Sequence, residues 1–202
     1  SGTNAKGATQ ECFNNSGAPT NEFRLGNECS IYGEMALTAN LLKTTSPEEK
    51  YFKSQVRLAL SAPGRSSFEN TTTSLVEAFV EGGNIQHSPV KYWVGKRFYR
   101  DVDLHMYDWY YYGNMNGNGA GVYDIRPGIG KLAVADLVQV GSNQSNIGTH
   151  ALEVLDLRWS EIKISPKDEL NFWFAWGSAP GSHTNTSIYL PYQGFIGGTR
   201  YR

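Results

Sequence analysis

The sequence lacks the features that mark several large classes of protein. It has only two cysteines, and no segment approaches the ~18 consecutive uncharged apolar residues of a membrane-spanning helix, so a helical membrane protein is excluded. Lys and Arg (18) nearly balance Asp and Glu (19), which gives no general attraction to nucleic acid. Phosphate-binding loops, nucleophile elbows and zinc-ligand spacings are absent. No catalytic residue, metal site, cofactor or nucleic-acid partner is therefore predicted.

The two cysteines flank a single segment. Cys12 and Cys29 are separated by residues rich in Gly, Asn and Pro, which favour a loop. A disulfide would staple loop 12–29 in an oxidising compartment, and two free thiols are the alternative. A metal site is disfavoured because no third or fourth ligand lies nearby in the sequence.

What the sequence does contain is aromatic residues and strict alternation. There are 12 Tyr, 9 Phe and 5 Trp. Apolar and polar residues alternate with a period of two, which predicts strands with one apolar and one mostly polar face. The clearest runs are 31–41, 52–60, 155–160 and 170–176.

The connections between these runs are of two kinds. A short one at Ser165–Asp168 contrasts with long Gly/Asn/Ser/Thr-rich ones at Gly141–Gly148 and Gly177–Thr186. Short turns at one end and long loops at the other are typical of outer-membrane β-barrels, whose alternating strands average to middling polarity. The mean hydropathy of −0.44 is compatible with such a fold. The predicted fold class is all-β, an antiparallel transmembrane β-barrel.

Two segments carry a family resemblance. The first contains RLGNEC (24–29), and the second contains GKRFY (95–99), followed by His105-Met106, Asp108, a run of tyrosines and the turn motif GxGAG (117–121). Together they resemble the maltoporin (LamB-type glycoporin) family. The resemblance is strong from Cys12 to Lys131 and looser after Leu132, so it matches the N-terminal half of the family.

The resemblance implies a fold and a setting. It implies an eighteen-stranded barrel, within the range of even strand numbers found in outer-membrane barrels, of which residues 1–202 would form one incomplete domain. It also implies a homotrimer in the outer membrane of a Gram-negative bacterium, in contact with its lipid, and outer loops that are a candidate phage receptor. Residues 100–124 are expected to form a third loop that folds inward and narrows the pore.

The resemblance further implies a path for linear oligosaccharides such as maltodextrins. Tyr32 matches an aromatic slide position, while Phe68 matches an aromatic lent to the neighbouring subunit. The polar track is matched by Arg24, Glu34, Asp108 and Tyr110, and Asp103 and Arg100 belong to the same predicted pathway. Stacking on a sugar's C–H face and hydrogen bonding to its hydroxyl rim require these residue types. The sequence departs from the family where maltose-selective members have arginines, because it has Val76 and Asp101 there.

Alternative interpretations remain open at this point. A soluble carbohydrate-binding β-sandwich would use the same aromatic and polar surface but bury its apolar rows against a second sheet. A glycoside hydrolase would need a carboxylate pair, for which Glu34, Asp103 and Asp108 are the candidates. The aromatic run Tyr107–Tyr112 could instead be an interfacial girdle or loop packing, and Arg24 and Glu34 simply solvated charges.

Overall fold

The computed structural model describes most of the strands and part of their connections. Main chain is described for residues 31–42, 44, 46, 49–62, 71–100, 103–104, 109–110, 114–140, 151–183 and 188–202. Among the described residues no helix is long and apolar enough to cross a membrane.

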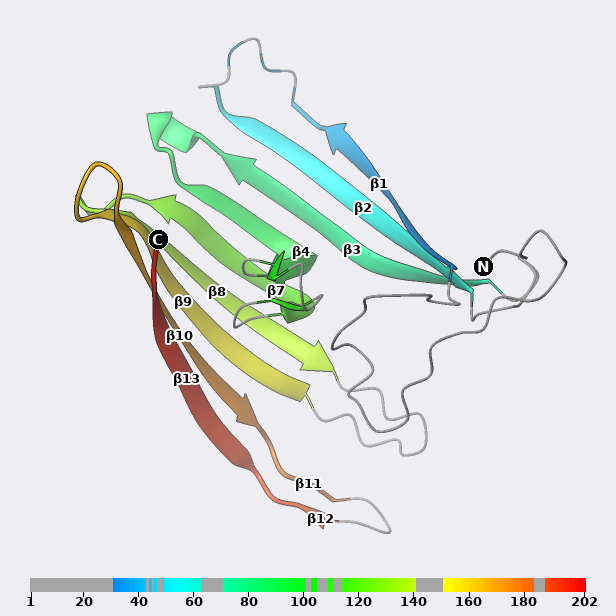
Figure 1. Ribbon diagram of the computed structural model, residues 1–202. Coiled ribbons are helices and arrows are strands. Elements are labelled where there is room, and N and C mark those ends of the chain that lie inside the picture. The colour runs from blue at the N-terminus through cyan, green and yellow to red at the C-terminus, as the bar shows by residue number, and fades with distance from the viewer. Residues whose placement is uncertain are drawn as a thin grey trace, which may run out of the picture.

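The described chain is organised around one antiparallel sheet of nine strands. Their spatial order is β1-β2-β3-β4-β7-β8-β9-β10-β13, so each large strand pairs with its nearest large neighbours in sequence. Figure 1 shows the sheet strongly curved, with β1 (blue) and β13 (red) at its two margins. The nine strands are β1 (Ile31–Asn40), β2 (Tyr51–Ala62), β3 (Thr72–Gly83), β4 (Lys91–Arg100), β7 (Asn114–Ile125), β8 (Lys131–Val140), β9 (Ala151–Lys163), β10 (Glu169–Ala179) and β13 (Tyr192–Tyr201).

Short elements lie between the large strands. β5 (Asp103–Leu104) pairs with β6 (Trp109–Tyr110), and β11 (Ser182–His183) pairs with β12 (Ile188–Tyr189). A 3₁₀ turn, η2 (Ile85–His87), follows β3.

The alternating runs form strands as predicted, and one glycine-rich segment does not form the predicted turn. The runs at 31–41, 52–60, 155–160 and 170–176 lie in β1, β2, β9 and β10. The GxGAG segment lies within β7, where Gly117 pairs with β4 and residues 118–121 pair with both β4 and β8, so the turn prediction for 117–121 is wrong. The long loop predicted at Gly177–Thr186 also begins later, because β10 extends to Ala179. Glycines signal a turn in isolation, but here they lie where neighbouring strands and rings approach the backbone closely.

The two faces of the sheet differ in polarity and exposure. On β10, Phe172 and Phe174 of the apolar row are 40% and 42% exposed, whereas Asn171 and Ala175 of the alternate row are 7% and 3% exposed. The same contrast holds on β9, where Leu155 and Leu157 are exposed and Asp156 is fully buried. We call the face with Asp156 the inner face and the face with the exposed apolar row the outer face. The described sheet has no second sheet packed on its apolar rows, which is the reverse of a soluble sandwich.

Large inner-face rings lie flat on glycines of the next strand. Cross-strand partners include Tyr51 with Gly83, Trp93 with Gly121 and Trp173 with Gly198. A Cβ on Gly121 would come within 2.4 Å of the Trp93 ring, and one on Gly198 within 2.5 Å of the Trp173 ring. Glycine thus lets a bulky ring lie along the wall instead of projecting from it.

The connections differ in length between the two ends of the strands. At one end they cover residues 41–50, 84–90, 126–130 and 164–168, and at the other 63–71, 101–113, 141–150 and 180–191. The turn between β9 and β10 is held by Asp168, whose carboxylate accepts hydrogen bonds from the Ser165 and Tyr201 hydroxyls. These bonds, the one from Ser165 first, hold the pKa of Asp168 below its ordinary value.

Candidate functional site: the inner face of the sheet

Two predicted pathway residues lie side by side on β1. Tyr32 and Glu34 are two residues apart on the inner face, and the Tyr32 hydroxyl donates to a Glu34 carboxylate oxygen. Tyr32 is 62% exposed, so its ring face is open to a ligand. The other Glu34 oxygen accepts from Arg57 Nη1 on β2 at 2.9 Å. An exposed ring beside an anchored carboxylate is the combination that a sugar ring requires.

Glu77 on β3 continues this polar chain. Its carboxylate is 4% exposed and accepts from Arg57 Nε at 2.6 Å and from Gln55 Nε2 at 2.8 Å. Its remaining bond comes from the backbone N–H of Phe98 on β4, at 3.1 Å. Side chains and backbone of four consecutive strands are therefore linked through Arg57 and Glu77.

Glu81, four residues after Glu77 on the same face of β3, is the centre of a second group of polar contacts. Its carboxylate, 2% exposed, lies 2.8 Å from Lys53 Nζ and 3.1 Å from Arg97 Nη1, and accepts from the Tyr51 hydroxyl at 2.9 Å. The Arg97 guanidinium also lies over the rings of Phe79, Trp93 and Tyr123. A buried carboxylate needs such partners, because an unpaired charge in a low-dielectric site is strongly unfavourable.

The β4–β7 hairpin leaves the sheet before its tip. β4 pairs with β7 as far as Arg100 with Asn114, but its pairing with β3 ends at Lys96 with Ala78. On the other side, pairing of β7 with β8 begins only at Asn118. We call residues 97–100 and 114–117 the hairpin end; it is bonded within itself and to neither neighbouring strand's ladder.

The hairpin end makes its contacts on the inner face. Arg158 of β9 donates to the Arg100 carbonyl (Nη1, 3.1 Å) and to the Tyr99 carbonyl (Nη2, 3.4 Å), and its guanidinium lies 3.9 Å from the Tyr99 ring centroid. The Arg158 Nε is held by Asp156 Oδ1 at 2.7 Å. Tyr99 stacks on Trp93, with ring centroids 5.7 Å apart. The hairpin end therefore bends over the inner wall formed by the later strands.

The structure brings together some of the predicted residues. Arg100 lies at the hairpin end with its guanidinium 3.7 Å from the Phe98 ring centroid, and Arg57 approaches the same ring. Asp103 and Tyr110 are direct register partners in the β5–β6 pair. Arg24, Phe68, Asp108, Cys12 and Cys29 lie outside the described residues, and their roles and the disulfide stay predictions.

The predicted inward loop is shorter than expected. Of the predicted loop 100–124, β4 includes Arg100 and β7 begins at Asn114, so the connection is 101–113, and its inward fold stays a prediction. The residues 114–124 are strand because their glycines allow close pairing with β4 and β8.

Several polar residues of this face were not predicted as functional. Alternation places Arg57 and Arg158 on polar faces. Their partners could not be predicted, because they depend on the pairing register of the strands, which a single sequence does not reveal. Glu77 and Glu81, two glutamates four residues apart in β3, are the available signal, since glutamate is rarely buried unless paired.

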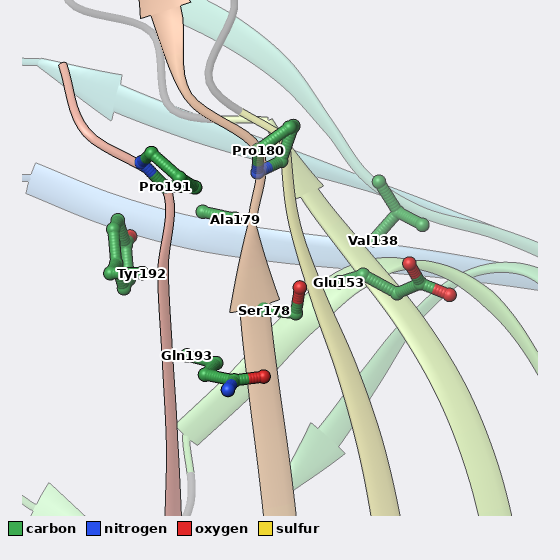
Figure 2. A pocket seen from close by; sticks show the side chains of 8 residues that line it. All are labelled: Val138, Glu153, Ser178, Ala179, Pro180, Pro191, Tyr192 and Gln193. Atoms are coloured by element: carbon green, nitrogen blue, oxygen red, sulfur yellow. The ribbon is translucent and has the colours of Figure 1, made fainter.

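A hollow near the β13 margin is not part of this array. It is lined by residues of β8, β9, β10 and β13 and by the prolines next to β10 and β13: Val138, Glu153, Ser178, Ala179, Pro180, Pro191, Tyr192 and Gln193. Figure 2 shows Gln193 extending from β13 toward the strand that carries Ser178. Glu153, Ser178 and Gln193 form one cross-strand row on the outer face, where the apolar row of β10 ends. None of the predicted pathway residues lines it.

Comparison with known protein families gives a match over nearly the whole chain. Residues 1–201 match the LamB porin family. The chain belongs to the LamB porin family. The match extends past Leu132, where the sequence motifs alone were weak, and it includes all nine strands of the sheet.

Membership of the LamB porins fits the geometry of the sheet. The family consists of β-barrel porins of the outer membrane that serve as sugar channels, and it is a channel family rather than an enzyme family. The antiparallel order, the exposed apolar outer face and the polar inner face agree with that fold.

Proposed function

We propose that this LamB porin conducts linear, maltodextrin-like oligosaccharides past an aromatic and polar path on its inner face, across the outer membrane of a Gram-negative bacterium. The path includes Tyr32 as a stacking platform, with Glu34 and Arg100 as partners of the sugar hydroxyls. Arg24, Asp103, Asp108 and Tyr110 are proposed to continue the polar track. Assembly as a homotrimer, with Phe68 reaching a neighbouring subunit's pore, belongs to the same proposal.

The observation that carries the proposal is the open Tyr32 ring beside an immobilised carboxylate. Glu34 is fixed by Tyr32 and by Arg57, so little conformational freedom is lost when it accepts a sugar hydroxyl. The ring of Tyr32 stays 62% exposed. Weak stacking plus a few charge-assisted hydrogen bonds suits transport, because tight binding at one point would slow exit.

The choice of sugar depends on the arginines of the track. Val76, where maltose-selective relatives are expected to have arginine, lies at a bulge of β3 between residues that pair with Leu58 and Arg57. Arg57 and Arg100 supply guanidinium groups close to this point, both over the Phe98 ring. We propose that these two replace the missing donors in part, because a guanidinium offers paired hydrogen-bond donors in a fixed plane.

The experiment is sugar-induced block of ion current. The complete protein is reconstituted in planar bilayers, and maltose to maltohexaose are titrated from one side. We expect saturable block that strengthens with chain length, and a loss of apparent affinity of roughly tenfold in Tyr32→Ala, which corresponds to ~1.4 kcal/mol.

The matched control is Tyr92→Ala. Tyr92 is 47% exposed and lies on the outer face of β4, so the same truncation there should leave the block unchanged. A current that no glucan alters, or an equal loss in both tyrosine variants, would reject the sugar path proposed here.

A further inference from the structure

The backbone groups freed where the β4–β7 hairpin leaves the sheet are satisfied by side chains. Beyond Lys96, β4 no longer bonds to β3. The N–H of Phe98 donates to the Glu77 carboxylate at 3.1 Å, and the Lys96 ammonium donates to the Leu75 carbonyl at 2.6 Å. Unpaired backbone groups in a poorly solvated place destabilise a fold, so these two bonds offset the loss of the strand ladder.

Two carbonyls further along β4 accept from a side chain of β9. Arg158 supplies one guanidinium to two successive carbonyls, those of Tyr99 and Arg100, while Asp156 fixes its Nε. Asp156 is fully buried and Arg158 has 17% of its side chain exposed. The Arg158 guanidinium is therefore held in place by Asp156 of its own strand, independently of its bonds to the hairpin end.

The bend itself occurs at two cross-strand glycines. Gly95 pairs with Gly119, immediately before the hairpin end. Gly95 has φ +127°, and a Cβ there would lie 2.3 Å from the Ala78 carbonyl oxygen. A Cβ on Gly119 would lie 2.2 Å from the Asp136 carbonyl oxygen. Both strands of the hairpin can change direction together only because neither has a side chain at this level.

We propose that Glu77 and Arg158 are positioning residues that hold the hairpin end over the inner face and thereby set the width of the channel at the hairpin end. Glu77 holds an N–H from the β3 side, and Arg158 holds two carbonyls from the β9 side. The β4 side of the hairpin end is thus held by side chains from two strands, β3 and β9. This inference deepens the proposed function, because the held segment narrows the same path that the sugar follows.

The two fastenings use charged side chains for a physical reason. A charge-assisted bond to a backbone group is about twice as strong as a neutral one. Each charge is already partnered on the wall, Glu77 by Arg57 and Arg158 by Asp156, so holding the hairpin end requires no new burial of an unpaired charge.

The test measures ion current in the absence of sugar, with the complete protein in planar bilayers. Glu77→Met and Arg158→Met keep the side-chain volume but remove the acceptor and the donors. We expect each to raise single-channel conductance by roughly twofold and open-channel current noise by several-fold, because the constriction moves and widens. Glu77→Gln should lie between the unaltered protein and Glu77→Met, because its amide oxygen can accept from Phe98 only if its amide nitrogen faces the Arg57 and Gln55 donors. Arg158→Lys should resemble Arg158→Met, because a single ammonium cannot bond Asp156 and two carbonyls together.

The matched control removes an ion pair elsewhere. Lys131→Ala breaks the Lys131–Glu161 pair (2.8 Å), which lies by the 126–130 turn, away from the hairpin end, and should change neither conductance nor noise. Unchanged conductance and noise in both methionine variants, or the same change in Lys131→Ala, would overturn the proposal.

A second measurement applies even where a variant fails to assemble. The Phe98 amide hydrogen, which points away from β7 and is held by Glu77, should exchange slowly in the unaltered protein. Complete exchange at the earliest time would overturn the role of Glu77. Because neither measurement uses sugar, a channel indifferent to glucans would reject the sugar path while leaving this inference to be decided on its own.

Discussion

At the scale of the residue, glycine does more here than shape turns. Gly83, Gly121 and Gly198 accept the flat ring of an aromatic partner, and Gly95 and Gly119 allow a bend across two paired strands. In each case the missing Cβ leaves room for something specific, either a ring or a carbonyl oxygen. These glycines therefore mark positions where a ring or a carbonyl oxygen of a neighbouring strand lies close to the backbone.

Gly95→Ala should be strongly unfavourable. Its φ of +127° suits glycine, and the new Cβ would meet the Ala78 carbonyl at 2.3 Å. We expect a loss of about 1–3 kcal/mol in folding stability, measured by urea titration of folding into lipid vesicles.

The control for this prediction is Gly33→Ala on β1. A Cβ there meets no atom within 4 Å, so the change should stay within about 0.5 kcal/mol. Equal effects at Gly95 and Gly33 would mean that the bend does not require a glycine.

At the scale of the element, each strand works as a two-sided unit. β4 is the clearest case, since Trp93 on its inner face is 3% exposed and Val94 on its outer face is 54% exposed. Trp93 packs with Ala135, Leu137, Val154 and Ala175, which belong to β8, β9 and β10. One inner-face ring thus ties the middle of the sheet to its later strands.

Trp93→Ala should destabilise far more than Val94→Ala. Removing the buried ring leaves a cavity over Gly121, and large-to-small changes of this kind cost about 3–5 kcal/mol. Val94→Ala removes a side chain that mainly contacts the surrounding medium, so it should lower the free energy of unfolding by about 1 kcal/mol or less. The comparison is made by urea titration of folding, and similar values for the two variants would contradict the assignment of the faces.

The same scale shows how far the sequence alone predicts this molecule. Period-two alternation correctly predicts β1, β2, β9 and β10, because one face of each is apolar and the other is not. It does not predict β7, because the glycines there interrupt the alternation of apolar and polar side chains. The site is predicted in part: Tyr32 and Glu34 follow from a motif, but the Arg57–Glu77–Phe98 connection depends on a register shift at Arg57 and Leu58 that sequence patterns do not encode.

At the scale of the whole molecule, the sheet reverses the usual arrangement of a soluble protein. The carboxylates of Glu77, Glu81 and Asp156 are buried, whereas large apolar side chains such as Leu157 and Phe174 are exposed. In water this arrangement would leave an extensive apolar surface uncovered, but in a bilayer the outer rows meet lipid of matching polarity.

A charge on the outer face should therefore be costly only in a membrane. Leu157→Arg places a guanidinium in the apolar outer row and should reduce the stability of the bilayer-inserted protein by about 2–4 kcal/mol. Thr38→Arg, at an exposed inner-face position of β1, should change it by about 0.5 kcal/mol or less. Stability is measured by urea titration in vesicles, and equal costs at the two positions would show that the Leu157 row does not face lipid.

The unequal connections at the two ends of the strands have a consequence for how such a protein can change over time. Segments 63–71, 141–150 and 180–191 join strands whose pairing is complete without them, so they can accept insertions and substitutions while the wall stays intact. Connection 101–113 is different, because the β4 residues that lead into it are bonded to Glu77 of β3 and to Arg158 of β9. Sequence change is therefore tolerated more readily in three of these four segments than in the fourth.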